Sequence, residues 1–188
     1  NYHLTTTRKE LLDMFGGKND TIFNRIFGRE IPTSQCREYE NEKESLYQAL
    51  YRPHIREVKG LTRLLIQLKQ EKIPVGLATS APTPNVEMIL EGLGVKNYFQ
   101  CIVDAGQIAK GKPDPEIFLK AAYGLETDPA SCLVIEDAPA GLQAAQKAGC
   151  HCVAILTTHT QEELTDAKIH IKDFTDPLLS FLIFGRRV

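Results

Sequence analysis

Residues 132–141 read CLVIEDAPAG, and this stretch decides the fold class. Its four apolar residues predict a short buried strand, and the carboxylates of Glu136 and Asp137 follow at once. Pro139 then stands where a helix begins, and Gly149 stops that helix after about three turns. A strand that passes through a polar turn into a helix is the repeating unit of a parallel α/β sheet.

The same unit recurs on both sides of this stretch. We predict further strands at 74–78, 101–103, 152–156 and 169–171, and helices near 61–68, 86–93 and 115–123. Residues 56–188 are therefore expected to form a doubly wound, Rossmann-like parallel sheet with helices on both faces. Residues 1–55 are polar and helical in pattern, which predicts a small separate helical domain.

The composition is that of an ordinary globular protein. The chain has 188 residues, 43% hydrophobic and 24% charged, with a formal net charge of -2. This charge gives no reason to expect nucleic acid or an acidic membrane as a partner. The sequence contains neither an apolar run long enough for a membrane span nor an apolar N-terminal signal.

Five cysteines are scattered through the chain. An odd number in mostly apolar surroundings indicates reduced thiols and a cytoplasmic protein rather than a disulfide framework. Cys150, His151 and Cys152 resemble a metal motif, but alternate residues of a strand point to opposite faces. No second ligand pair follows at finger spacing, so we interpret them as buried or half-buried thiols.

Polar residues follow three of the predicted segments. Thr79 and Ser80 come after the strand at 74–78, Lys112 lies in the loop before the helix near 115, and Glu136 and Asp137 follow the strand at 132–135. Ligands of doubly wound sheets bind at the carboxyl ends of the strands. A hydroxyl, a lysine and two carboxylates at that edge suit a phosphate group next to a divalent cation.

Each of these features also has a simpler interpretation. Thr79 and Ser80 could cap a helix, and the adjacent acids could cap the helix that begins near Pro139. The loop around Lys112 could be a plain turn, in which Asp114 is best assigned as a helix cap rather than a catalytic residue. Together, in this order and at strand ends, the residues favour a site.

Three segments resemble motifs of a known family. GLATS at 76–80, KGKPDP at 110–115 and IEDAPAG at 135–141 resemble the second, third and fourth motifs of the haloacid dehalogenase superfamily. KAG at 147–149 is also similar to its beta-phosphoglucomutase-like branch. The resemblance extends over roughly residues 10–175.

The resemblance implies roles for particular residues. Thr79 and Lys112 are implied to bind the transferred phosphate with Ser80 beside them, and Glu136 and Asp137 to form the site of Mg²⁺. Residues 1–55 are implied to be a helical cap. Within it, FGGKND at 15–20 resembles the loop that closes over the leaving group, which makes Lys18 and Asn19 candidates for substrate specificity; an exposed turn that enters a helix is the alternative.

The first family motif, Asp-x-Asp, does not occur in the 188 residues. In the family its first aspartate attacks phosphorus and its strand lies at the centre of the sheet. Asp104 ends a strand, but its position between the second and third motifs argues against this role. We therefore expect a longer, N-terminally extended native protein, unpaired strand edges in this chain, and no phosphatase activity from it alone.

The function expected from the resemblance is Mg²⁺-dependent phosphoryl transfer through an aspartyl-phosphate, acting on a small, sugar-type phosphomonoester. Hydrolysis is favoured over a mutase reaction, and a non-catalytic phosphate-binding homologue is a further alternative. A receiver domain fits less well because its acids come first in the chain, and no Gly-x-Gly-x-x-Gly supports dinucleotide binding. The sequence leaves substrate and oligomeric state open.

Overall fold

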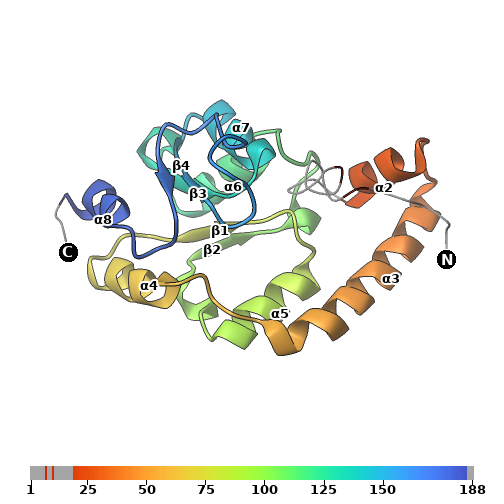
Figure 1. The fold of residues 1–188 in the computed structure, drawn as a ribbon, viewed down its shortest axis with the longest axis horizontal. Coiled ribbons are helices and arrows are strands. Elements are labelled where there is room, and N and C mark those ends of the chain that lie inside the picture. Colours follow the sequence, from red (N-terminus) through yellow and green to blue (C-terminus); the bar gives the residue numbers. More distant parts are fainter. Residues whose placement is uncertain (1–6, 8–9, 11–18, 186–188) are drawn as a thin grey trace.

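The computed structural model describes residues 7, 10 and 19–185. Residues 19–51 include two α-helices, α2 (Asn19–Phe27) and α3 (Thr33–Tyr51), and we call this pair the helical lobe. They lie to one side of the strands (Figure 1). The prediction that residues 1–55 form a domain of their own stays a prediction.

Strands and helices alternate through the rest of the described chain, as predicted. The strands are β1 (Gly76–Ala78), β2 (Cys101–Val103), β3 (Leu133–Glu136), β4 (His151–Ile155) and β5 (His170–Ile171). The helices are α4 (Leu61–Gln70), α5 (Thr83–Leu93), α6 (Glu116–Gly124), α7 (Pro139–Lys147) and α8 (Pro177–Phe184). Short 3₁₀ turns are η1 (Arg52–His54), η2 (Lys96–Tyr98), η3 (Ala105–Gln107) and η4 (Pro129–Ser131).

The described strands form two parallel sheets, both within the α/β fold that the sequence predicts. One sheet pairs β1 with β2, and the other has the order β3–β4–β5. Among the described residues, each sheet thus has an edge strand, β1 or β3, that is paired on one side. This separation agrees with the unpaired edges expected from the sequence; that a further strand belongs between them stays a prediction.

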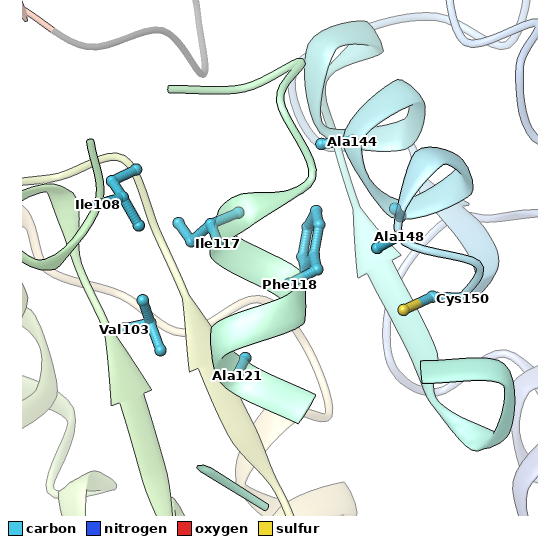
Figure 2. Close-up of a cluster of buried hydrophobic side chains, with 9 residues drawn as sticks. Val103, Ile108, Ile117, Phe118, Ala121, Ala144, Ala148 and Cys150 are labelled. Atoms are coloured by element: carbon cyan, nitrogen blue, oxygen red, sulfur yellow. The ribbon is translucent and has the colours of Figure 1, made fainter. Parts of the chain in front are cut away.

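Helices on both faces join the two sheets into one core. On one face, α4 sends Leu65 toward β1 and β2 and Leu64 and Leu68 toward β4. On the other face, α6 and α7 pack together against both sheets. Figure 2 shows this second cluster, in which Ile117 and Phe118 of α6 lie between Val103 of β2 and the alanines of α7.

Strand residues alternate between these two clusters. In β3, Leu133 and Ile135 face the cluster with α4 and α8, while Val134 faces α6 and α7. The alternation follows from the two-residue period of a strand, and it explains why the strands are mostly apolar: both of their faces pack against helices. The carboxyl ends are then the places where polar side chains leave the core.

Candidate functional site at the carboxyl ends of the strands

Glu136 is the last residue of β3, and its side chain lies buried between Lys112 and the start of α7. Its Oε1 accepts a hydrogen bond from Lys112 Nζ, with which it forms an ion pair. Its Oε2 accepts from the backbone N–H groups of Asp137 at 2.8 Å and Ala138 at 3.1 Å. A buried carboxylate is stable when its oxygens are paired in this way.

Gly141 provides the space for this carboxylate. A Cβ atom at position 141 would overlap the carboxylate of Glu136. The glycine therefore has a packing function in the first turn of α7, three residues beyond Ala138, the second of the two backbone donors.

Lys112 is held from two sides. Its side chain is 5% exposed, and its Nζ lies 5.0 Å from the centre of the Phe118 ring, in addition to the contact with Glu136. Its neighbour Asp114 accepts from the Glu116 N–H at 3.0 Å, so the assignment of Asp114 as a helix cap is confirmed. The charge of Lys112 is thus paired with Glu136, and its role in binding phosphate stays a prediction.

Asp137 is half-buried, and the loop after β4 holds its backbone in place. Its carbonyl accepts from Thr158 Oγ1 at 2.8 Å and lies 2.8 Å from His159 Nδ1. Thr157 Oγ1 donates to the carboxylate at 3.3 Å. Burial raises the pKa of Asp137 above its ordinary value, and the charge of Glu136 raises it further, against the opposing effect of the threonine hydroxyls.

Three residues that support Asp137 were not predicted: Thr157, Thr158 and His159. They follow β4, so the rule that singled out the residues after β1 and β3 could have found them too. Their hydroxyls and ring support the backbone and carboxylate of Asp137, which fixes its direction.

Thr79 follows β1, in the other sheet. Its N–H continues the ladder by donating to Val103 O at 2.9 Å, and its Oγ1 accepts from Ala81 N at 3.1 Å. The 79–82 loop is tied to the turn after β2, because Ala105 N donates to Ala81 O at 3.1 Å. At the start of α5, Thr83 Oγ1 also donates to Asp104 Oδ2 at 2.6 Å. Asp104 also caps η3, a structural role that agrees with its rejection as the nucleophile.

The structure thus brings Lys112 and Glu136 into contact, with Asp137 next to them, and places Thr79 and Ser80 at the end of the other sheet. That Thr79, Ser80 and Lys112 share one ligand stays a prediction. The amide of Asn19 donates to Glu40 at 2.9 Å and Glu44 at 2.8 Å of α3, and its part in substrate specificity stays a prediction. Lys18 lies outside the described residues.

Hard oxygen ligands for a cation are present in this cluster, in keeping with the predicted Mg²⁺. Glu136 and Asp137 supply carboxylates, and one or two carboxylates with water and phosphate oxygens satisfy Mg²⁺. Within the described part of the chain, no group of three or more His, Cys, Asp or Glu side chains forms a metal cluster. The cysteines described there are free thiols, including Cys150 and Cys152.

The fold and these residues define a doubly wound α/β protein with a lysine–carboxylate site at its strand ends. Comparison with known proteins gives the family: the model of the haloacid dehalogenase-like hydrolases matches residues 1–155. The chain belongs to this family, so the resemblance inferred from three motifs is confirmed.

Individual relatives refine the comparison. The chain is 40% identical over 119 residues to validoxylamine A 7'-phosphate phosphatase of Streptomyces hygroscopicus subsp. limoneus, covering 63% of this chain and 56% of that protein. It is 49% identical over 96 residues to beta-phosphoglucomutase of Bacillus subtilis, covering 51% and 42%. The chain thus spans about half the length of these relatives.

A solved structure supports the branch as well as the fold. The beta-phosphoglucomutase of Clostridium difficile superimposes with a TM-score of 0.81 at 29% identity, over 92% of this chain and 78% of that one. The similarity includes the helical lobe as well as the sheets, since it leaves out less than a tenth of the chain. Every helix in the described part of the chain is too short or too polar to cross a membrane.

Proposed function

We propose that this protein transfers a phosphoryl group from a small, sugar-type phosphomonoester with the help of Mg²⁺, and that hydrolysis is its reaction. The observation that carries the proposal is the buried pair of Lys112 and Glu136 with Asp137 beside it. Phosphoryl transfer depends on neutralising charge at the equatorial oxygens, which a fixed lysine and a cation site do. Relatives named as phosphatases support the choice of reaction.

The residues take distinct parts in this proposal. Lys112 and the Thr79 hydroxyl bind the phosphate, and Ser80 follows Thr79 in the loop after β1. Asp137 gives a carboxylate to Mg²⁺, while Glu136, already engaged by three donors, holds Lys112 in place within the same magnesium site. Mg²⁺ supplies positive charge that offsets the charge of the phosphate and of the two acids.

The bond changes follow from the family chemistry that the resemblance implies. A carboxylate oxygen of an Asp-x-Asp aspartate attacks phosphorus, the P–O bond to the sugar breaks, and the leaving oxygen takes up a proton. Water then attacks the aspartyl-phosphate, which releases inorganic phosphate and restores the carboxylate. We propose that this aspartate belongs to a strand between β1 and β3, each of which is paired on one side only among the described residues.

A mutase is the second candidate, because the matched segment of Bacillus subtilis beta-phosphoglucomutase is 49% identical. In that reaction a second sugar hydroxyl, rather than water, takes the phosphoryl group. The two reactions use the same phosphate and magnesium residues, so the tests below bear on both.

Binding of inorganic phosphate to the chain tests the site without the nucleophile. We expect calorimetry to show Mg²⁺-dependent phosphate binding that Lys112→Met abolishes and Lys110→Met retains, since the Lys110 side chain is 76% exposed and pairs with Asp114. In the Asp137→Asn variant, the binding of inorganic phosphate should no longer depend on Mg²⁺. Equal phosphate binding by the Lys112→Met and Lys110→Met variants would refute the assignment.

A further inference from the structure

One buried hydrogen bond joins the helical lobe to the core. Asn85, in the first turn of α5, donates from Nδ2 to Glu44 Oε2 of α3 at 2.5 Å. Both residues are 7% exposed. Gln48, one turn further along α3, donates from Nε2 to Asn85 Oδ1 at 2.8 Å. The Asn85 amide is thus held on both its oxygen and its nitrogen by one face of α3.

The second oxygen of Glu44 gathers donors from inside the helical lobe. Its Oε1 accepts from Asn19 Nδ2 at 2.8 Å and from Lys43 Nζ, and Lys43 also donates to Asn19 Oδ1 at 2.8 Å. A carboxylate buried this deeply is stable when such donors are in place. Glu44 therefore links α2, α3 and α5 at one point, and any movement of the helical lobe away from α5 breaks its bond with Asn85.

Asn85 is hydrogen-bonded to the end of the loop that carries Thr79 and Ser80. Its N–H donates to Pro82 O at 3.0 Å, and Pro82 is the last residue of the loop before α5. In the same loop the Thr79 hydroxyl accepts from Ala81 N at 3.1 Å. A shift of Asn85 with α3 is transmitted to the loop through this one helical turn.

We propose that Glu44, Gln48 and Asn85 form a latch that couples the seating of the helical lobe to the geometry of the 79–82 loop. This inference rests on the proposed function, because the loop matters as a phosphate site. Glu44 and Asn85 are positioning residues in this scheme, acting through Thr79 and Ser80. Coupling of this kind is reciprocal, so phosphate in the loop also favours the seated lobe.

An exchange of charge between the two positions tests the latch. Asn85→Asp sets two carboxylates against each other, whereas adding Glu44→Gln restores one carboxylate and one amide. We expect Asn85→Asp to weaken binding of inorganic phosphate, with Mg²⁺ present, about tenfold, and the double variant to recover to within about threefold of the original. Glu40→Gln is the matched control, since Glu40 contacts Asn19 from the same helix and should change binding less than about twofold.

Amide hydrogen exchange separates positioning from mere stability. Without phosphate, we expect the amides of residues 79–81 to exchange about tenfold faster in Asn85→Asp than in the unchanged protein, with recovery in the double variant. Should Asn85→Asp fail to fold, Gln48→Ala removes one bond of the latch and should give a smaller change of the same kind.

The results distinguish failure of the latch from failure of the proposed function. If the exchange at 79–81 stays unchanged while overall stability falls, the latch is a static contact and the inference is overturned. If the unchanged protein binds no phosphate, the proposed function fails, and the exchange experiment still decides whether lobe and loop are coupled.

Discussion

Two glutamates with equally buried side chains lie in different parts of this molecule. Glu136 at the strand ends and Glu44 in the helical lobe are each 9% exposed at the side chain, and each pairs with a lysine. Lys112 is 5% exposed, but Lys43 is 48% exposed. The first pair is closed off from solvent, whereas the second is open on the side of its lysine.

The other donors differ in origin. Glu136 receives two N–H groups from the next two residues of the chain. Glu44 receives side-chain donors from positions 25 and 41 residues away in sequence. One carboxylate is therefore satisfied by a local motif, and the other by the way separate helices pack. We expect the first to be rigid and the second to respond to changes in that packing.

Removal of the Lys112 charge should lower the free energy of unfolding more than any other substitution near the two glutamates. Lys112→Met leaves the carboxylate of Glu136 buried without its cation, and breaking a buried pair on one side costs about 3 to 5 kcal/mol. We expect urea unfolding at neutral pH to show a loss in this range.

Lys110→Met provides the control for this prediction. Lys110 lies in the same loop, but its ion pair with Asp114 spans 3.8 Å at the surface, and such pairs contribute under about 1 kcal/mol. Similar losses from the two variants would mean that Glu136 does not depend on Lys112.

A methyl group at Gly141 should disturb Glu136 from the other side. Gly141→Ala forces the carboxylate away from its backbone donors, and overpacking of this kind costs up to about 3 kcal/mol. Thermal unfolding should show the loss. Gln143→Ala, at an exposed position of the same helix, should cost less than about 1 kcal/mol. A stable Gly141→Ala variant with Lys112 and Glu136 still in contact would contradict the packing role.

The same contrast, between local motifs and tertiary packing, explains which features of the structure can be predicted from the sequence. Strand β2 lies where its apolar run predicts it, and the other strands agree to within one or two residues at their ends, because burial on both faces leaves a local signal. The family motifs similarly placed Lys112 beside Glu136. Helix α8 was not predicted, although Asp176 followed by proline is a helix start.

Other features depend on tertiary packing and have no local signal. Nothing near Glu44 indicates that Asn85 will meet it, and α3 alone reads as a polar, solvent-exposed helix. The same holds for Asn19, whose hydrogen bonds with Glu40 and Glu44 have no signal in the residues next to it.

The pH dependence of stability gives the smallest and most selective test of the comparison. Burial raises the pKa of Glu44, but hydrogen bonds from Lys43, Asn19 and Asn85 outweigh it and hold that pKa below the ordinary value of 4.5. A depressed pKa in the folded state stabilises the protein above the unfolded value, and this contribution disappears as the pH falls through the folded value.

At pH 7 we therefore expect the free energy of unfolding of the unchanged protein to be about 1 kcal/mol higher than that of Glu44→Gln. This difference, or gap, should disappear below about pH 4. Urea unfolding at a series of pH values measures the gap. Asn85→Ala removes one donor to the carboxylate, so the gap measured in that background should be smaller. A gap that stays constant down to pH 3 would show that Glu44 is not held as a buried anion by the neighbours that the structure gives it.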